Sequence, residues 1–217
     1  MGIEERERKV YRPLRRAGLE VVPNAVPEGM IPFVHGYRTE DVTGGFWHPY
    51  DTPRLVERLN ADWYHLARLS GLLDDRREFL LQLPQGTRSH RAVRQLMGDG
   101  RPPALWTRVR LLHRWDLMGR GAGSAFLGVH AGHPGFGMMA LDGSVYVSAS
   151  TGETGVDVLA VSRPDRSENV LRHLRWMARW DGNSADCREL RGRIAAWLDA
   201  RPGVSGGRGS GGGGPAR

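Results

Sequence analysis

The sequence of 217 residues predicts an α+β fold. We expect a helical N-terminal half with short strands, then an antiparallel meander closed by two C-terminal helices. Apolar residues recur at helical spacing before residue 120 and again after residue 163, whereas the segment between them consists of short apolar runs separated by turn residues. Strands and helices do not alternate as they do in a parallel sheet, which also favours the α+β class.

Residues 1–201 are predicted to form a single α+β domain with a soft internal division near residue 120. Residues 202–217, PGVSGGRGSGGGGPAR, differ sharply in composition. So much glycine cannot offset the entropy lost on ordering, so this segment is predicted to be a disordered Gly/Arg tail.

The first half of the chain is predicted to contain helices and short strands. The charged start, EERERKVYRPLRR, predicts a helix that Pro13 interrupts. Short strands are expected in GLEVVP and GMIPFVHGY, which are bounded by Gly or Pro. The clearest helix has Thr52 as N-cap and Pro53 as its first residue, and its apolar stripe comprises Leu55, Val56, Leu59, Trp63, Leu66 and Ala67. Two further helices are predicted in DDRREFLLQL and SHRAVRQLMG, whereas PALWTRVRLLHRWDLMG fits neither period.

The second half predicts four strands and two closing helices. The strands are expected in SAFLGVHA, GFGMMAL, SVYVSAS and ETGVDVLAVS, with a hairpin turn at Asp142-Gly143. The alternation in SVYVSAS predicts that one of its faces meets solvent. The first helix is expected to begin at a capping box of Asp165 and Glu168, and its stripe is Val170, Leu174, Met177 and Trp180. The second begins near Ser184, with Leu190, Ile194, Trp197 and Leu198 as its apolar face.

Composition bounds the class of protein. The formal net charge is +7 and the pI is about 10.4, which is typical of proteins with a polyanionic partner. Lys9 is the only lysine, however, so the arginine content also indicates a GC-rich bacterial genome, and part of the charge is compositional. Cys187 is the only cysteine, which excludes an intramolecular disulfide and a four-cysteine zinc site. No run is long and apolar enough for a membrane helix, and the charged start lacks a secretory signal, so we expect no membrane association and a cytoplasmic location.

The densest polar stretch is FVHGYRTEDVTGGFWHPYD, residues 33–51. One hypothesis is a ligand loop, in which Tyr37 stacks on a ring, Arg38 binds a phosphate or carboxylate, and an acidic residue works with a histidine in acid–base chemistry. The alternative, which we favour, is a polar surface loop with solvated charges. The candidate ligand residues are His35, Tyr37, Arg38, Glu40, Asp41 and His48.

Arginines alternate with aromatic residues in LWTRVRLLHRW and LRHLRWMARW. Alternating cations and rings can hold a nucleic-acid strand by stacking and phosphate contact. The alternative is that Trp180 anchors the core and the arginines extend around it. The candidate polyanion contacts are Arg108, Arg110, Arg114, Arg172, Arg175 and Arg179.

Neither a metal nor a cofactor is predicted. His130 and His133 form an H-x-x-H pair, but at a Gly/Pro-rich turn that does not fix the direction of metal ligands. The sequence contains no phosphate-binding P-loop, and its one GxSxG match, GVSGG, lies in the tail without a flanking strand or helix.

The sequence therefore predicts a small cytoplasmic binding module, non-enzymatic, that acts through a protein partner by a sheet edge or its basic helices. The first alternative is a nucleic-acid-associated basic protein. The second is an enzyme or nucleotide-ligand site built on residues 33–51, with His35 and either Glu40 or Asp41 in acid–base roles; no catalytic residue is assigned.

Overall fold

The computed structural model describes residues 11–22, 26–82, 106–124, 127–180 and 185–201. Three predicted segments fall outside this part of the chain: residues 4–10 of the first helix, the helix in SHRAVRQLMG, and the disordered tail.

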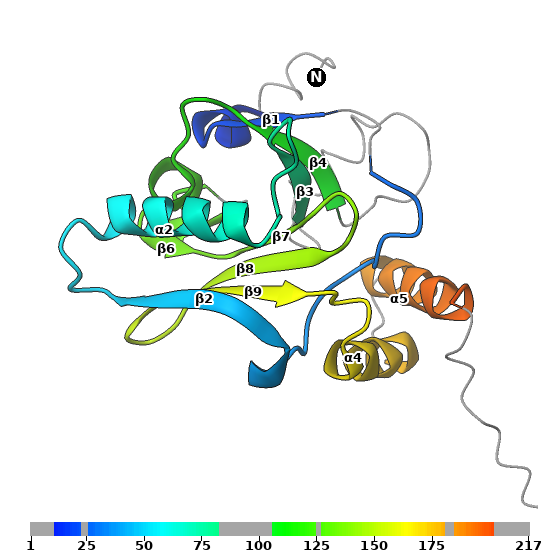
Figure 1. Ribbon diagram of the computed structural model, residues 1–217. Coiled ribbons are helices and arrows are strands. Elements are labelled where there is room, and N and C mark those ends of the chain that lie inside the picture. The colour runs from blue at the N-terminus through cyan, green and yellow to red at the C-terminus, as the bar shows by residue number, and fades with distance from the viewer. Residues whose placement is uncertain (1–10, 23–25, 83–105, 125–126, 181–184, 202–217) are drawn as a thin grey trace, which may run out of the picture.

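An antiparallel sheet of seven strands organises the fold, in the order β1-β4-β3-β7-β8-β9-β2 (Figure 1). The α+β class is thus confirmed. A separate two-stranded ribbon pairs β5 with β6. The strands are β1 Leu19–Val21, β2 Val42–Pro49, β3 Glu78–Gln82, β4 Trp106–Leu111, β5 Gly128–His130, β6 His133–Pro134, β7 Phe136–Met139, β8 Val145–Thr151 and β9 Gly155–Ser162.

Helices cover both faces of this sheet. One face packs against α2, Leu55–Leu69, and the other against α4, Glu168–Arg179, and α5, Ala185–Asp199 (Figure 1). Shorter helical turns occur at residues 11–16, in the 3₁₀ helix η1, Thr39–Asp41, and in the π-helix η2, Leu117–Gly121. Among the described residues, no helix has both the length and the apolar character needed to cross a membrane.

The core is therefore divided by the sheet. On β8, Val145, Val147 and Ala149 pack on the α2 side, while Tyr146 packs on the side of α4 and α5. The prediction that one face of this strand meets solvent is wrong, because the closing helices cover it. The Asp142-Gly143 hairpin is confirmed: Gly143 has a φ of 72°, and the Ser144 amide donates to the Asp142 carboxylate at 2.9 Å.

The N-terminal half is less helical than predicted. Within DDRREFLLQL, residues 78–82 form β3 instead of a helix. This strand is paired on both sides and buried on both faces, so its apolar run lacks the alternation that marks a half-exposed strand. GMIPFVHGY is not a strand, and residues 106–111 of the ambiguous segment form β4.

Two predicted helix starts are also wrong in detail. Helix α2 begins at Leu55, after Arg54 in the left-handed region with a φ of 57°, rather than at Pro53. At α4 the N-cap is Ser167, whose hydroxyl accepts from the Val170 amide at 3.1 Å. Asp165 instead pairs with Arg163 and Arg201, each at 3.1 Å.

Candidate functional site

The predicted ligand loop, residues 33–51, is two different structures. Residues 33–38 run without regular structure beside α4 and α5, and η1 then leads into the edge strand β2 (Figure 1). The α4 side holds Tyr37, whose hydroxyl is hydrogen-bonded to that of Ser148 at 2.6 Å. On the α2 side, His48 lies 2.7 Å from the Asp62 carboxylate of α2. The sheet therefore separates His48 from the other candidate residues.

His35 lies against α4 rather than beside a carboxylate. Its ring is 4.7 Å from the ring of His173, measured between centroids, and 5.8 Å from that of Phe33. The neighbouring Gly36 has a φ of 76°, and a Cβ atom added there would come within 2.6 Å of the His173 Cβ atom. The space beside the Gly36 backbone is thus filled by α4.

Asp41 joins η1 to the first turn of α4. Its carboxylate accepts from the Ser167 hydroxyl at 2.7 Å, from the Asn169 amide group at 3.0 Å and from the Arg38 backbone amide at 2.7 Å. Burial raises the pKa of this carboxyl group, but these hydrogen bonds outweigh it, so the pKa lies below its ordinary value. Glu40 accepts from Asn169 as well, at 3.0 Å. Both acidic residues thus hold α4 in place.

A row of five aromatic side chains crosses the junction between residues 33–38 and α4. We call Phe33, His35, His173, Trp176 and Trp180 the aromatic ladder. From His173 to Trp176 the centroids are 5.4 Å apart, and from Trp176 to Trp180 they are 6.3 Å apart with the planes inclined by 23°. The two tryptophans are 58% and 50% exposed. The prediction that Trp180 anchors the core is therefore wrong: it is the C-cap residue of α4, and its ring faces outward.

His173 is the most enclosed histidine of the ladder. Burial lowers the pKa of its imidazole, and the neighbouring His35 lowers it further. We therefore expect this ring to be neutral at pH 7 and to present its face as an uncharged surface.

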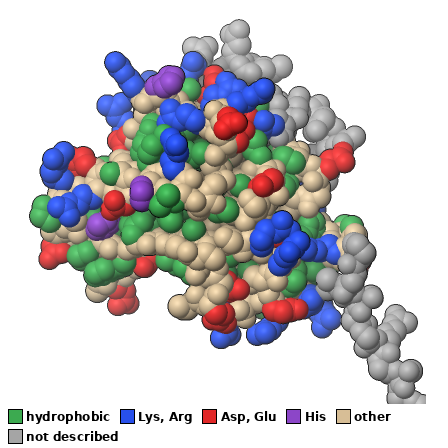
Figure 2. All heavy atoms as spheres, in the orientation of Figure 1, with side chains coloured by type: hydrophobic (Ala, Val, Ile, Leu, Met, Phe, Trp, Pro, Cys, Tyr) green, Lys and Arg blue, Asp and Glu red, His purple; other side chains and the backbone are tan. Residues whose placement is uncertain are grey.

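The candidate arginines divide into three groups. Three of them, Arg172, Arg175 and Arg179, lie on α4 beside the ladder. Arg175 pairs with Glu168 at 3.3 Å, whereas Arg172 and Arg179 form no ion pair with any described residue. Figure 2 shows Lys and Arg side chains, with some acidic ones, over the part of the molecule that carries α4 and α5.

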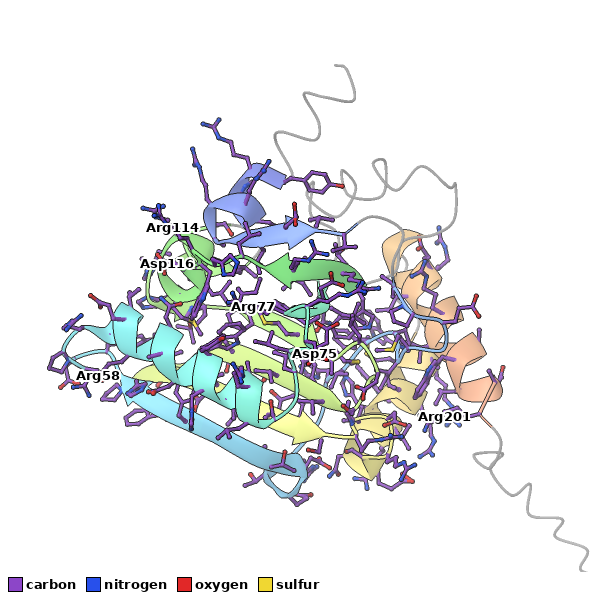
Figure 3. All side chains as sticks on the ribbon, turned by 45° about the horizontal axis from the view of Figure 1, so that its top comes forward. Arg58, Asp75, Arg77, Arg114, Asp116 and Arg201 are labelled. Carbon is purple, nitrogen blue, oxygen red and sulfur yellow. The ribbon has the colours of Figure 1, made fainter. Side chains whose placement is uncertain are left out.

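The remaining candidate arginines lie elsewhere. Arg108 and Arg110 of β4 both contact the carboxylate of Glu78, which is 1% exposed, at 2.6 and 2.9 Å. Burial raises the pKa of Glu78, but the two guanidinium groups outweigh it and lower the pKa overall. Arg114 and Asp116 lie at the other side of the molecule from Arg201 and α5 (Figure 3). The six arginines therefore do not form one surface.

The two edges of the sheet differ in a way that the sequence analysis missed. β1 has three residues, including Glu20, whereas β2 has eight residues, VTGGFWHP, and no charge. The Tyr50 amide donates to the Thr154 carbonyl, and bonded positions alternate along an antiparallel pair. The backbone groups of Gly45 and Trp47 therefore point away from β9. The sequence signal that could have predicted β2 is the alternation along the strand, in which Gly45 and Trp47 face one way and Phe46 and His48 the other.

No metal centre emerges from the described part of the chain, where no group of three or more His, Cys, Asp or Glu side chains could hold a metal ion. The His130 and His133 rings are 3.6 Å apart, and Tyr50 stacks on His133 at 4.7 Å. This contact joins the two-stranded ribbon to the end of β2.

Comparisons of the chain with protein-family models, with curated proteins and with solved structures found no match. The function must therefore be argued from the geometry.

Proposed function

We propose that this chain is a non-enzymatic, cytoplasmic binding module that takes an extended segment of a protein partner along β2. The observation that carries the proposal is the open edge of this strand. The partner segment would add as an eighth strand of the sheet, in the manner of peptides that pair with exposed sheet edges.

The backbone of β2 offers the hydrogen bonds that such a segment needs. Gly45 and Trp47 direct their amide and carbonyl groups outward, while Pro49 lacks an amide hydrogen and closes one end of the edge. Natural proteins usually protect long edge strands with charges, central prolines or short length. β2 has a bulge between Val42 and Gly44 but no charge and no central proline, so it remains available for pairing.

Trp47 supplies a side-chain anchor on the same strand. Its ring is 50% exposed, and partly exposed tryptophans are enriched among the residues that dominate the energy of protein interfaces. The half-exposed ring lies beside outward backbone groups that pair with no other described strand, which favours a protein partner over a small ligand.

The internal bonding of the polar residues supports a non-enzymatic role. Asp41 and Glu40 bond to the start of α4, and Tyr37 bonds to Ser148. His48 contacts Asp62 and Phe46, and none of its described contacts is with a Ser, Thr or Cys side chain. A nucleophile activated by a neighbouring base is therefore absent from the described surroundings of His48.

The partner can be trapped with a photo-crosslinking amino acid at position 47. The same amino acid at position 58 serves as control, because Arg58 lies exposed on α2 (Figure 3).

Binding of the purified partner is then compared between Trp47→Ala and Trp47→Pro. The first removes only the ring, while the second also removes an outward amide hydrogen without interrupting the β2–β9 ladder.

We expect Trp47→Ala to weaken binding about tenfold or more and Trp47→Pro to weaken it further. Amide hydrogen exchange of residues 43–49 should slow when the partner is bound. Equal affinity of the two variants, with unchanged exchange in β2, would contradict strand addition. Thermal unfolding of both variants checks that the fold is retained.

A further inference from the structure

We propose that the aromatic ladder, together with Arg172 and Arg179 of α4, forms a binding surface for an unpaired nucleic-acid strand. This surface lies on α4 and on residues 33–38, and it does not include the open edge of β2. The inference goes beyond the protein-binding role and stands on different residues.

The exposed face of α4 alternates cations and rings. Residues three and four apart share one side of a helix, which brings Arg172, His173, Trp176, Arg179 and Trp180 together. The opposite side carries the buried residues Val170, Leu171 and Leu174. The alternation noted in the sequence is thus an ordered surface in three dimensions, and about 12 Å of helix separates its first and last residues.

The ladder is held at three places before any ligand arrives. The backbone next to His35 is held because Tyr37, two residues later, bonds to Ser148 at 2.6 Å. The start of α4 is fixed by the bond between Ser167 and Asp41. At the other end, the Arg191 side chain of α5 donates to the Trp180 carbonyl at 2.9 Å. A surface fixed in this way loses little conformational entropy on binding.

The rings suit bases better than they suit a second protein. Their centroid separations are those of rings already in contact, so bases would stack on the outer faces and not between the rings. Every base offers such a face, and this makes stacking on aromatic side chains tolerant of sequence. In a duplex the base faces are occupied by neighbouring pairs, so the ladder would select an unpaired strand.

The charges suit a phosphate backbone. After Glu168 the helix contains three arginines and no acidic residue. Because Arg172 and Arg179 have no ion pair within the described residues, phosphates can approach them without displacing a carboxylate. The ladder supplies stacking and the two arginines supply the charge contacts that single-strand binders combine.

The test is fluorescence anisotropy of a labelled oligothymidylate about 12 nucleotides long, within the site sizes of known single-strand binders. A duplex of the same length is measured in parallel. We expect the single strand to bind more tightly than the duplex. Trp176→Ala and Trp180→Ala should each weaken binding about tenfold, and Trp176→Phe should retain most of the affinity because it keeps a ring.

Arg172→Ala should reduce the slope of log affinity against log salt by about 0.7, the value for one phosphate contact on a single strand. Matched controls lie elsewhere: Trp47→Ala removes a tryptophan of equal exposure on β2, and Arg58→Ala removes an exposed arginine of α2. Both controls should leave the affinity unchanged. Thermal unfolding verifies each variant, and the arginine and Trp180 variants keep the test decisive if Trp176→Ala fails to fold.

Three outcomes would overturn the proposal. The first is that oligothymidylate does not bind. This result would overturn the proposal even if a protein partner were found to cover α4. The second is equal affinity for the duplex, which would indicate charge attraction without stacking. The third is an equal effect of the ladder and control substitutions. None of these results bears on strand addition at β2, which the Trp47 pair tests separately.

Discussion

The two faces of the sheet are covered in different ways. On the α2 side the rings are enclosed: Trp63 is fully buried and makes edge contacts with Phe79 and Trp115. On the α4 side the core residues are also buried, but the outer surface keeps Trp176 and Trp180 exposed. Tryptophan is thus part of the core on one face and remains exposed on the other, where we propose that it contacts a nucleic-acid strand.

Replacing one tryptophan on each face of the sheet should give the largest difference in stability between the two faces. Trp63→Ala should lower the free energy of unfolding by about 3–5 kcal/mol, because it removes a fully buried ring and leaves a cavity. Trp180→Ala should lower it by only about 1–2 kcal/mol, because half of its ring is already exposed to water and only the other half is lost from contact. Chemical denaturation of both variants measures the difference, and equal losses would contradict the contrast between the faces.

A smaller effect is expected where charge is buried. Glu78→Gln should cost about 2 kcal/mol, less than a fully buried pair, because Arg108 and Arg110 retain partial contact with water. The pKa of Glu78 is lowered in the folded state, so its contribution is present above the ordinary value of 4.5 and is lost as pH falls through the lower folded value.

Below pH 4.5 the wild type should therefore lose stability more steeply than the Glu78→Gln variant. Urea denaturation at a series of pH values measures this. Parallel pH profiles of the two proteins would show that Glu78 carries no such contribution.

The smallest expected effect concerns His173. Its pKa is lowered in the folded state by burial and by His35, so the unfolded chain binds a proton more readily. Stability should fall as pH drops below the ordinary value of 6.5 and approaches the lower folded value. His173→Gln should flatten the stability profile in this range, with His65→Gln on the exposed side of α2 as control. Identical profiles for wild type and His173→Gln would contradict the assignment.

Local signals in the sequence predicted the local elements well. The stripe of α2 and the turn between β7 and β8 each depend on residues close together in the chain, so spacing and turn chemistry suffice. β3 was predicted as a helix because a strand buried on both faces shows no alternation. β2 was not predicted because Gly44 and Gly45 resemble a turn, and only pairing with β9 shows their extended conformation.

The candidate site was predictable only in parts. The sequence identified His35 and the arginines of α4 separately, but the contact of His35 with His173 of α4 depends on a fold that brings residues 33–38 beside this helix. In the same way, no local pattern indicates that Arg108 and Arg110 share the carboxylate of Glu78 or that Asp41 bonds to Ser167. Long-range contacts of this kind follow from topology, which periodicity does not encode.

The pairing of β2 with β9 has a consequence for the order of folding. β2 ends at Pro49, but its partner strand begins only at Gly155, so more than a hundred residues must be synthesised before the two can meet. Contacts between such distant segments form slowly, because the entropy of closing the intervening loop is lost before the pairing stabilises it. During translation both edges of β2 therefore remain unpaired, and this uncharged strand needs protection from aggregation until β9 emerges.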